Sequence, residues 1–469
     1  NITTELNKLQ DMAKLLYAFF LILALLLLNT QVLYTQAPNN NMYLIANKND
    51  HLTNLLYSAI WGYVAPNGRE YAILGCPDGT AFYDITDSSN VRESGFVPGL
   101  SSYWREFKTF GHYAYIVSEA EGSGLQIVDL QYLPDSVHLV NTFLFEGYSK
   151  THTISQSGPY LYMNGGNYSA SGIFVLDLSS DPVVPVKRGQ WETEYIHDCR
   201  IKNDTIWASA IFGGRNYVID AVNKDSLRTI TSWLNTPEPG PHNCDLTVDS
   251  KHLLVTDEIG GNVRMLKIWN IEDLFNPVLI STWQPTGINF SVVHNVEVYG
   301  NYALIAHYSA GVRLVDVTNP AQPTEVAWYD TYPVNNERNY DGCWGVYAFP
   351  SGKIAASDRQ TGLYVLKSIV GTLGISGNTG IPENFELRQN YPNPFNPVTK
   401  IEFALPKSGY VTLKVFDITG RVVGVLADGF HTAGIHIINY DASMLSSGVY
   451  FYRLESGKNN LTRKMILLK

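Results

Sequence analysis

The sequence has little cysteine, which excludes a fold held together by disulfide bonds. Only four cysteines occur among 469 residues, far fewer than a disulfide-stapled scaffold of this length would use. Cys199 and Cys244 each stand two residues after a histidine, so we expect them on neighbouring inner strands of a repeat. Two alternatives stay open: an oxidising compartment favours one bridge, and the distance between strands opposes it.

Charge is also sparse, and most of it is acidic. Asp, Glu, Lys and Arg make up 16% of the chain, whose formal net charge is −10. Residues 38–383 carry −14 and residues 384–469 carry +4. An acidic body repels nucleic acid and attracts cations, although ordinary solubility charge explains it equally well. We therefore predict no nucleic-acid partner.

Long apolar runs are missing except for one near the start of the chain. Leu15–Leu28 is an apolar run of 14 residues that follows Met12 and Lys14, and Asn29–Ala37 is polar. This order is typical of a signal peptide, and the run is short for a membrane span. We predict upstream residues and a signal peptide over 1–37. A retained membrane anchor is the alternative.

Common catalytic motifs are absent too. The chain has no Gly-x-Ser-x-Gly elbow, no His-Glu-x-x-His motif and no phosphate-binding loop. Glu119 and Glu121 could act as paired carboxylates, but a solvated loop explains them as well. No catalytic residue is assigned, and whether the chain is an enzyme stays open.

The sequence does contain a repeat, which recurs seven times between about Leu55 and Ser368. Each unit opens on Trp or His and closes on an apolar strand such as Val312–Val317. Successive openings lie 43–52 residues apart. A period of this length, built from short strands, is typical of a β-propeller with one four-stranded blade per repeat. The openings are Trp61, Trp104, His152, His197, His242, His294 and Trp344.

The seventh repeat supplies only three strands, so its fourth strand must come from elsewhere. Leu52–Ser58 stands just ahead of the first opening, where every other blade has its outer strand. We predict that this segment pairs with Leu363–Lys367 and closes the ring.

The end of the chain predicts a second, smaller domain. Thr399–Leu405, Val411–Asp417 and Ile435–Tyr440 alternate like strands of a β-sandwich. The predicted fold is therefore all-β, a seven-bladed β-propeller over 38–368 followed by a small C-terminal β-sandwich over 384–469. Residues 369–383 form a Gly-rich linker between them.

Several motifs of the propeller region resemble known repeats. The strands IVDL, VLDL and LVDV resemble LVIVD repeats, and Trp61-Gly62-Tyr63 with Asp341-Gly342-Cys343-Trp344 resembles the choice-of-anchor B propeller family. That family consists of surface or secreted propellers fused to varying anchors. The resemblance implies a surface or secreted propeller and brings no firm biochemical activity.

The C-terminal region resembles the type A sorting domain of type IX secretion. The resemblance rests on Asn390–Pro397 (NYPNPFNP), on Ser447–Tyr452 (SGVYFY) and on the basic end Arg463–Lys469. It implies export through the periplasm of a Gram-negative cell, with residues 384–469 as the partner of the secretion machinery. It also implies a secreted or cell-surface location, with attachment to the outer membrane by anchoring and no transmembrane span.

The candidate site residues gather on one face of the predicted propeller. The first strand of each blade lines the channel, and the loops that enter strand one and leave strand two share a face. Four of the eleven histidines open consecutive repeats. The predicted metal ligands are His152, His197, His242, His294 and His307. The predicted ligand-binding residues are Trp61, Trp104, Arg105, Glu119, Asp257, Glu258, Trp344, Asp358 and Arg359.

Two interpretations of the histidines stay open from the sequence. Imidazoles that converge with carboxylates suit a divalent cofactor such as Zn²⁺, Cu²⁺ or Fe²⁺, or a bound anion if the rings are protonated. Alternatively, each histidine is a latch that bonds to the backbone of the next blade.

The predicted function is an extracellular binding module with an unknown extracellular ligand. Two rival functions stay open: a metal-dependent hydrolase or oxidoreductase that uses the histidines, and a structural component of a surface layer.

Overall fold

The computed structural model describes residues 39–469 apart from 54–55, 262, 371–384, 407–408 and 432–433. The predicted signal peptide and nearly all of the predicted linker lie outside these residues. Within the described part, the regular elements are strands and one helical turn, η1 (Ser169–Ser171). The prediction of an all-β chain is confirmed.

Seven antiparallel sheets follow one another along the described part of the propeller region, and each runs from an inner to an outer strand. We number them as blades one to seven. Blade one contains β3 (Ile60–Val64), β4 (Glu70–Cys76), β5 (Gly79–Asp84) and β6 (Arg92–Pro98). Blade two contains β7 (Arg105–Phe110), β8 (Tyr113–Ser118), β9 (Leu125–Asp129) and β10 (His138–Phe143). Blade three contains β11 (Thr153–Ser157), β12 (Tyr160–Asn164), β13 (Ile173–Asp177) and β14 (Val186–Trp191). Blade four contains β15 (Asp198–Lys202), β16 (Thr205–Ala210), β17 (Arg215–Asp220) and β18 (Arg228–Leu234). Blade five contains β19 (Pro241–Leu246), β20 (His252–Asp257), β21 (Leu266–Asn270) and β22 (Val278–Trp283). Blade six contains β23 (Val296–Tyr299), β24 (Tyr302–Ala306), β25 (Val312–Asp316) and β26 (Thr324–Tyr329). Blade seven is β27 (Cys343–Ala348), β28 (Lys353–Asp358), β29 (Gly362–Ser368) and β2 (Met42–Lys48).

The inner strands form a closed ring. Each contacts the inner strand of the next blade, from β3 through β7, β11, β15, β19 and β23 to β27, and β27 contacts β3 again. The ring places the start of every inner strand on one face, as the sequence predicted. It thereby defines a central channel with a mouth on that face.

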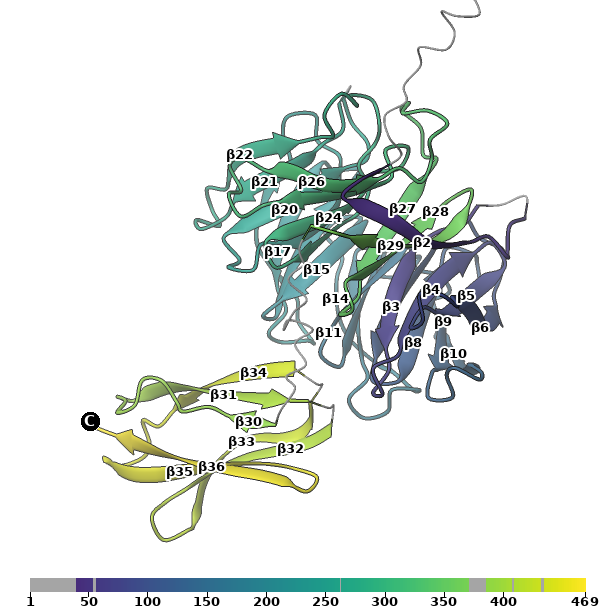
Figure 1. The fold of residues 1–469 in the computed structure, drawn as a ribbon. Helices are drawn as coiled ribbons and strands as arrows, with labels where there is room; N and C mark the ends of the chain where they lie inside the picture. Colours follow the sequence, from purple (N-terminus) through teal and green to yellow (C-terminus); the bar gives the residue numbers. More distant parts are fainter. Residues whose placement is uncertain (1–38, 54–55, 262, 371–384, 407–408, 432–433) are drawn as a thin grey trace, which may run out of the picture.

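The closing strand comes from the N-terminal side, but the predicted segment was wrong. Met42–Lys48 pairs antiparallel with β29, with Met42 opposite Ser368 and Lys48 opposite Leu363. Figure 1 shows purple β2 beside green β29. Part of the predicted segment Leu52–Ser58 instead turns inward: Tyr57 is fully buried, and its N–H donates to the carbonyl of Arg359. The chain needs these residues to cross from the rim to the channel before β3. The short β1 (Asn39–Asn40) extends blade six at β26.

Apolar side chains between the blades hold the ring together. Every residue of β4, β13 and β28 is buried, because each middle strand is covered by a neighbouring blade on both faces. Between blades six and seven, for example, Leu304 and Leu314 share a cluster with Val346. Each such side chain contributes about 1.5–3 kcal/mol when it leaves water.

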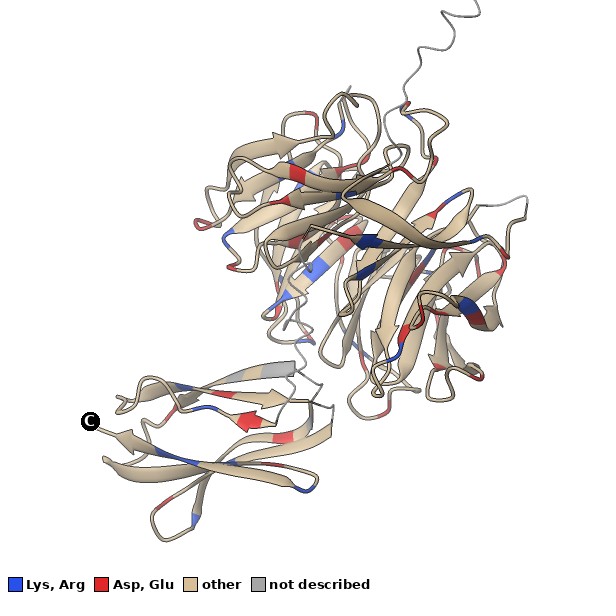
Figure 2. Ribbon diagram, viewed as in Figure 1, with Lys and Arg blue, Asp and Glu red and all other residues tan. Residues whose placement is uncertain are grey.

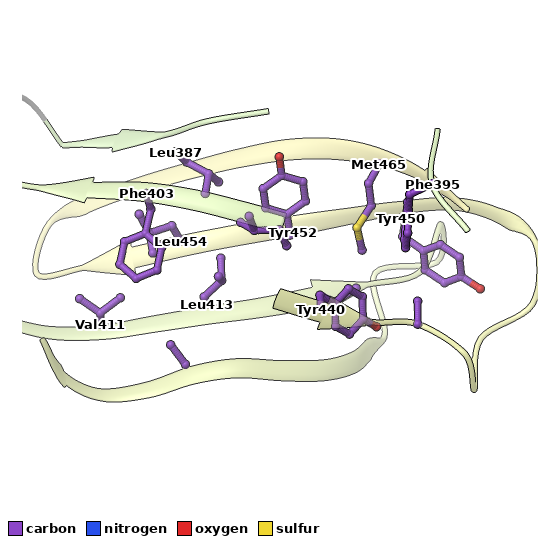
Figure 3. Close-up of a cluster of buried hydrophobic side chains, with 14 of the residues drawn as sticks. Leu387, Phe395, Phe403, Val411, Leu413, Tyr440, Tyr450, Tyr452, Leu454 and Met465 are labelled. Carbon is purple, nitrogen blue, oxygen red and sulfur yellow. The ribbon is translucent and has the colours of Figure 1, made fainter. Parts of the chain in front are cut away.

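The C-terminal part forms two smaller sheets. One contains β30 (Glu386–Leu387), β31 (Val398–Leu405) and β34 (Gly434–Asp441). The other contains β32 (Gly409–Phe416), β33 (Val422–His431), β35 (Gly448–Ser456) and β36 (Asn459–Leu467). Leu413, Tyr452, Leu454 and Met465 are fully buried within one cluster with Phe403 (Figure 3). The predicted sandwich is thus present, and the basic end of the chain forms its strand β36.

Candidate metal centre

Four histidines lie side by side at the mouth of the central channel. His152 and His197 directly precede β11 and β15, His242 is the second residue of β19, and His294 stands two residues before β23. Because they occupy one repeat position in consecutive blades, their rings follow one another in an arc. The ring centroids are 4.1 Å (His152–His197), 4.2 Å (His197–His242) and 4.1 Å (His242–His294) apart.

The two ends of this histidine arc differ. At one end, His152 Nδ1 lies 2.5 Å from Glu119 Oε1, and its Nε2 lies 2.8 Å from His197 Nε2. Two deprotonated nitrogens would repel at that distance, so a proton lies between them. At the other end, the His294 ring packs 4.8 Å from both Trp344 and Tyr308.

Two of the histidines are latches between blades. The His242 Nδ1–H donates to the carbonyl of His294 at 3.2 Å, and the His294 Nδ1–H donates to the carbonyl of Trp344 at 2.5 Å. A carbonyl can only accept, so this bond fixes the tautomer and leaves a lone pair on each Nε2. A latched imidazole is therefore oriented as a metal ligand, and the two interpretations of the histidines are compatible.

Glu258 faces these free nitrogens. Its Oε2 lies 3.6 Å from His242 Nε2, and its Oε1 lies 3.8 Å from His294 Nε2. The Tyr308 hydroxyl donates to Oε1 at 2.6 Å and holds the carboxylate in place. Both distances are too long for direct hydrogen bonds, but they match ligands on either side of a cation.

The mouth has room for a single ion. The space between the histidines, Asn295, Trp344 and Trp104 is about 10 Å³, close to the volume that one water needs and far below that of an organic substrate. His197, His242 and Glu258 each offer a ligand atom, and these atoms lie within 4.8 Å of one another. Asn295 Oδ1 is buried without a hydrogen-bond partner among the described residues. These donors fit a metal ion.

Burial keeps the imidazoles neutral. It lowers the pKa of His197, His242 and His294, and in His197 and His294 neighbouring histidines lower it further. Burial also disfavours the charged form of Glu119, but the hydrogen bond to His152 together with the charges of His152 and Lys150 outweighs it, so the pKa of this carboxyl is lowered. Neutral imidazoles beside a carboxylate can bind a cation and have little tendency to bind an anion.

A polar layer supports the histidine arc from below. Asn243 donates to Asp198 Oδ2 at 2.7 Å and accepts from the Val296 N–H at 3.0 Å. Deeper in the channel, Arg200 pairs with Glu297 at 2.8 Å and with Asp245 at 3.3 Å. The histidines therefore rest on an inter-blade network, and charged groups of both signs fill the channel beneath them. On the outer loops acidic and basic residues are interspersed as well (Figure 2).

Several predicted ligand-binding residues do lie at the mouth. Trp104, Trp344 and the histidines line the same space, with Glu119 and Glu258 on its edge. The Arg359 guanidinium lies 5.1 Å above the Trp344 ring.

Three other predicted ligand-binding residues use their side-chain polar atoms in bonds to other parts of the propeller. Arg105 is buried and donates to the carbonyl of Leu100 at 2.7 Å. Asp257 is buried in an ion pair with Lys267 at 2.7 Å. Asp358 accepts hydrogen bonds from the turn that follows it, including that of Thr361 Oγ1 at 2.7 Å. Asp257 and Asp358 therefore satisfy polar groups of their own blades, whereas Arg105 also lines the space at the mouth.

Trp61 and His307 are also displaced from the predicted site. Trp61 lies deeper in the channel, with the Lys108 ammonium 3.7 Å from its ring centroid. His307 Nδ1 contacts Ser291 Oγ at 3.0 Å, inside blade six. Its neighbour Tyr308, which follows the end of β24 and has a positive φ of 26°, reaches the site instead.

Sequence reasoning missed Tyr308, Tyr340 and Arg264 as residues of this face. A one-residue shift from His307 would have found Tyr308, as Glu258 was found beside Asp257. Tyr340 and Arg264 lie on loops without a repeat pattern, so the sequence carried no signal for them.

The cysteines are free in the structure. The Cys199 thiol points to Asn164 Oδ1 at 3.3 Å, and the Cys244 thiol points to the carbonyl of Trp207 at 3.4 Å. The bridge considered from the sequence is therefore not formed, because each thiol faces its own hydrogen-bond acceptor.

Two regions match known protein families. Residues 389–468 match the family described as the secretion system C-terminal sorting domain, and residues 292–331, which contain blade six, match the LVIVD repeat. The chain is a secreted β-propeller exported by type IX secretion. Its destination is the cell surface or the extracellular space. Among the described residues, no helix is long and apolar enough to cross a membrane.

Solved structures with a similar fold are distant from this secreted propeller. A putative 6-phosphogluconolactonase from Bacteroides fragilis is 14% identical, with a TM-score of 0.48 over 82% of this chain and 98% of that chain. The periplasmic gluconolactonase PpgL of Pseudomonas aeruginosa is 13% identical, with a TM-score of 0.46 over 58% of this chain and 85% of that chain. PorZ of Porphyromonas gingivalis, a surface component of the type IX secretion system, is 12% identical, with a TM-score of 0.43 over 86% of this chain. The secreted propeller spans only 58% of the PorZ chain. No curated protein matches the sequence.

Proposed function

We propose that this secreted propeller is an extracellular binding module whose channel mouth holds one divalent transition-metal ion and binds its ligand through that ion. One observation carries the proposal: His197, His242 and Glu258 offer ligand atoms within 4.8 Å of one another, and the two histidines line a space of about 10 Å³.

The donor types favour a borderline metal such as Zn²⁺ over Ca²⁺ or Mg²⁺, which prefer oxygen ligands. Donors of a tetrahedral zinc ion lie roughly 3.3 Å apart when each is about 2.0–2.1 Å from the metal. The 3.6 Å between His242 Nε2 and Glu258 Oε2 is close to that separation. At the His152–His197 contact, a cation can take the place of the shared proton if the two nitrogens move from 2.8 Å to about 3.3 Å apart.

A metal-dependent enzyme is the second candidate, and the same donor set favours it. Two histidines and one glutamate leave a coordination position open for water or substrate, as catalytic zinc sites do. Turnover that depends on both the ion and Glu258 would favour the enzyme, and metal-dependent binding without turnover favours the binding module.

The variant Glu258→Gln tests the site in the purified full chain. Glutamine keeps an oxygen for the Tyr308 hydroxyl but loses the charge. After chelator treatment, titration calorimetry with Zn²⁺ should give one site in the unchanged chain and at least about tenfold weaker binding in the variant.

Glu194→Gln is the matched control, because Glu194 accepts from the Tyr217 hydroxyl at 2.6 Å in the same way and does not belong to the ligand group of His197, His242 and Glu258. The control should bind zinc like the unchanged chain. Equal zinc binding by both variants, or no zinc binding by the unchanged chain, would contradict the proposal.

A further inference from the structure

We propose that the mouth carries a second, cationic subsite, formed by Arg264 and Arg359 around Tyr340, which binds the carboxylate of an acidic saccharide. This inference rests on the proposed function, because the same saccharide would also reach the ion at the histidine arc.

Two guanidinium groups meet at Tyr340. Arg264 Nη1 donates to the Tyr340 hydroxyl at 3.1 Å, and Arg359 Nη1 donates to the Tyr340 carbonyl at 2.6 Å. Neither arginine forms an ion pair with a described carboxylate, and Arg359 Nε is buried without a hydrogen-bond partner among the described residues. The nearby Asp341 is engaged by Gln360 Nε2 at 2.5 Å. A guanidinium has five N–H donors, of which these two side chains use one or two, and both side chains are partly exposed, so both arginines retain donors for an anion from outside.

This arginine pair is next to the metal centre. Arg359 stacks on Trp344, whose ring packs 4.8 Å from His294. Tyr340 packs 5.4 Å from Tyr308, the residue that holds Glu258. The Trp344 ring therefore lies between the Arg359 guanidinium and the His294 imidazole. A ligand of a few sugar units can contact both of these groups, whereas a single small anion cannot.

Exposed aromatic rings lie on the same face of the propeller as the mouth. The loops that enter strand one or leave strand two carry Tyr103, Trp104, Phe212, Phe290 and Tyr340, which are 37–74% exposed. The loops on the opposite face carry only two such rings among the described residues, Tyr132 and Phe275. Flat apolar rings stack on the C–H faces of sugars, which distinguishes a saccharide from a bare anion.

The arginine pair, the aromatic rings and the metal ion each bind a different group of an acidic saccharide. A guanidinium binds a carboxylate through two parallel hydrogen bonds, aromatic rings hold the sugar faces, and the ion accepts a further oxygen. A uronic-acid oligosaccharide offers all three groups at once.

The test compares three probes on the zinc-loaded full chain: a trimer of galacturonic acid, a neutral galactose trimer and inorganic phosphate. The acidic trimer should bind at least about tenfold more tightly than the neutral trimer and than phosphate. The double variant Arg264→Gln/Arg359→Gln should lose that advantage and keep its zinc, whereas Arg228→Gln on the outer strand β18 should change neither.

The two proposals fail in different ways. If zinc does not bind but the acidic trimer still needs the two arginines, the proposed function fails and the cationic subsite stands. If zinc binds but the double variant binds the acidic trimer like Arg228→Gln, the subsite is overturned. Equal binding of acidic and neutral trimers, or of phosphate and the acidic trimer, overturns the choice of an acidic saccharide.

Discussion

At the scale of single residues, the two nitrogens of a channel histidine have separate tasks. Nδ1 of His242 and of His294 joins neighbouring blades, and Nε2 faces Glu258. Burial lowers the pKa of both rings, so protons compete weakly with a metal ion at neutral pH. One side chain thereby serves both the stability of the ring and the binding of a cation.

His307 predicts a pH dependence of stability. Burial, and to a lesser extent the charge of Arg313, lowers its pKa to about 3 in the folded chain, whereas the unfolded value is about 6.5. Between these two values the imidazole is protonated in the unfolded chain and neutral in the folded chain. The free energy of unfolding therefore falls as the pH drops below about 6.5. For this group the loss approaches about 1.4 kcal/mol per pH unit once the pH is well below about 6.5.

Urea unfolding at pH 7, 6 and 5 measures this slope. His307→Gln should reduce the loss of stability between pH 7 and pH 5 by about 2 kcal/mol, whereas the exposed His138→Gln should leave it unchanged. An unaltered slope in His307→Gln would show that this ring is not buried in neutral form.

The sequence predicted the residues that depend on the repeat and failed on those that depend on side-chain direction. The four arc histidines were identifiable because they recur at one position. His307, Asp257 and Asp358 were wrong because a repeat locates a strand end but not which of two adjacent side chains faces the channel. Tyr340 and Arg264 could not be predicted as site residues, because no repeat pattern determines where residues of long loops lie.

At the scale of elements, β2 completes blade seven and should be needed for its stability. Met42 is 2% exposed and packs in the cluster between blades six and seven, whereas the adjacent Tyr43 is 45% exposed. Met42→Ala should cost about 2–5 kcal/mol, because it leaves a cavity in that cluster. Thermal unfolding should show a clear drop for Met42→Ala and little change for Tyr43→Ala, and equal effects would contradict the packing of β2.

Strand existence was predictable because each blade repeats the same apolar pattern and turn residues. The identity of the closing strand was not, because Met42–Lys48 and Leu52–Ser58 both precede the first repeat. Only the burial of Tyr57 and its bond to Arg359 show that the later segment is needed for the crossing into the channel.

At the scale of the whole molecule, folding and export should depend on different parts of the chain. The propeller and the C-terminal sandwich have separate cores, and the sorting-domain match lies entirely in the second. A chain truncated after Ile369 should fold and stay in the periplasm of a host with type IX secretion. Fractionation of host cells measures this, and surface display of the truncated chain would contradict the role of residues 384–469.

The proposed metal centre places one transition-metal ion in the channel mouth. The most direct measurement is an anomalous-difference map, recorded at the zinc absorption edge, from crystals of the full chain grown with Zn²⁺. The account predicts one strong peak in the mouth, about 2.0–2.2 Å from ligand atoms of His197, His242 and Glu258. A mouth without a peak, with the His152–His197 contact unchanged, would contradict it.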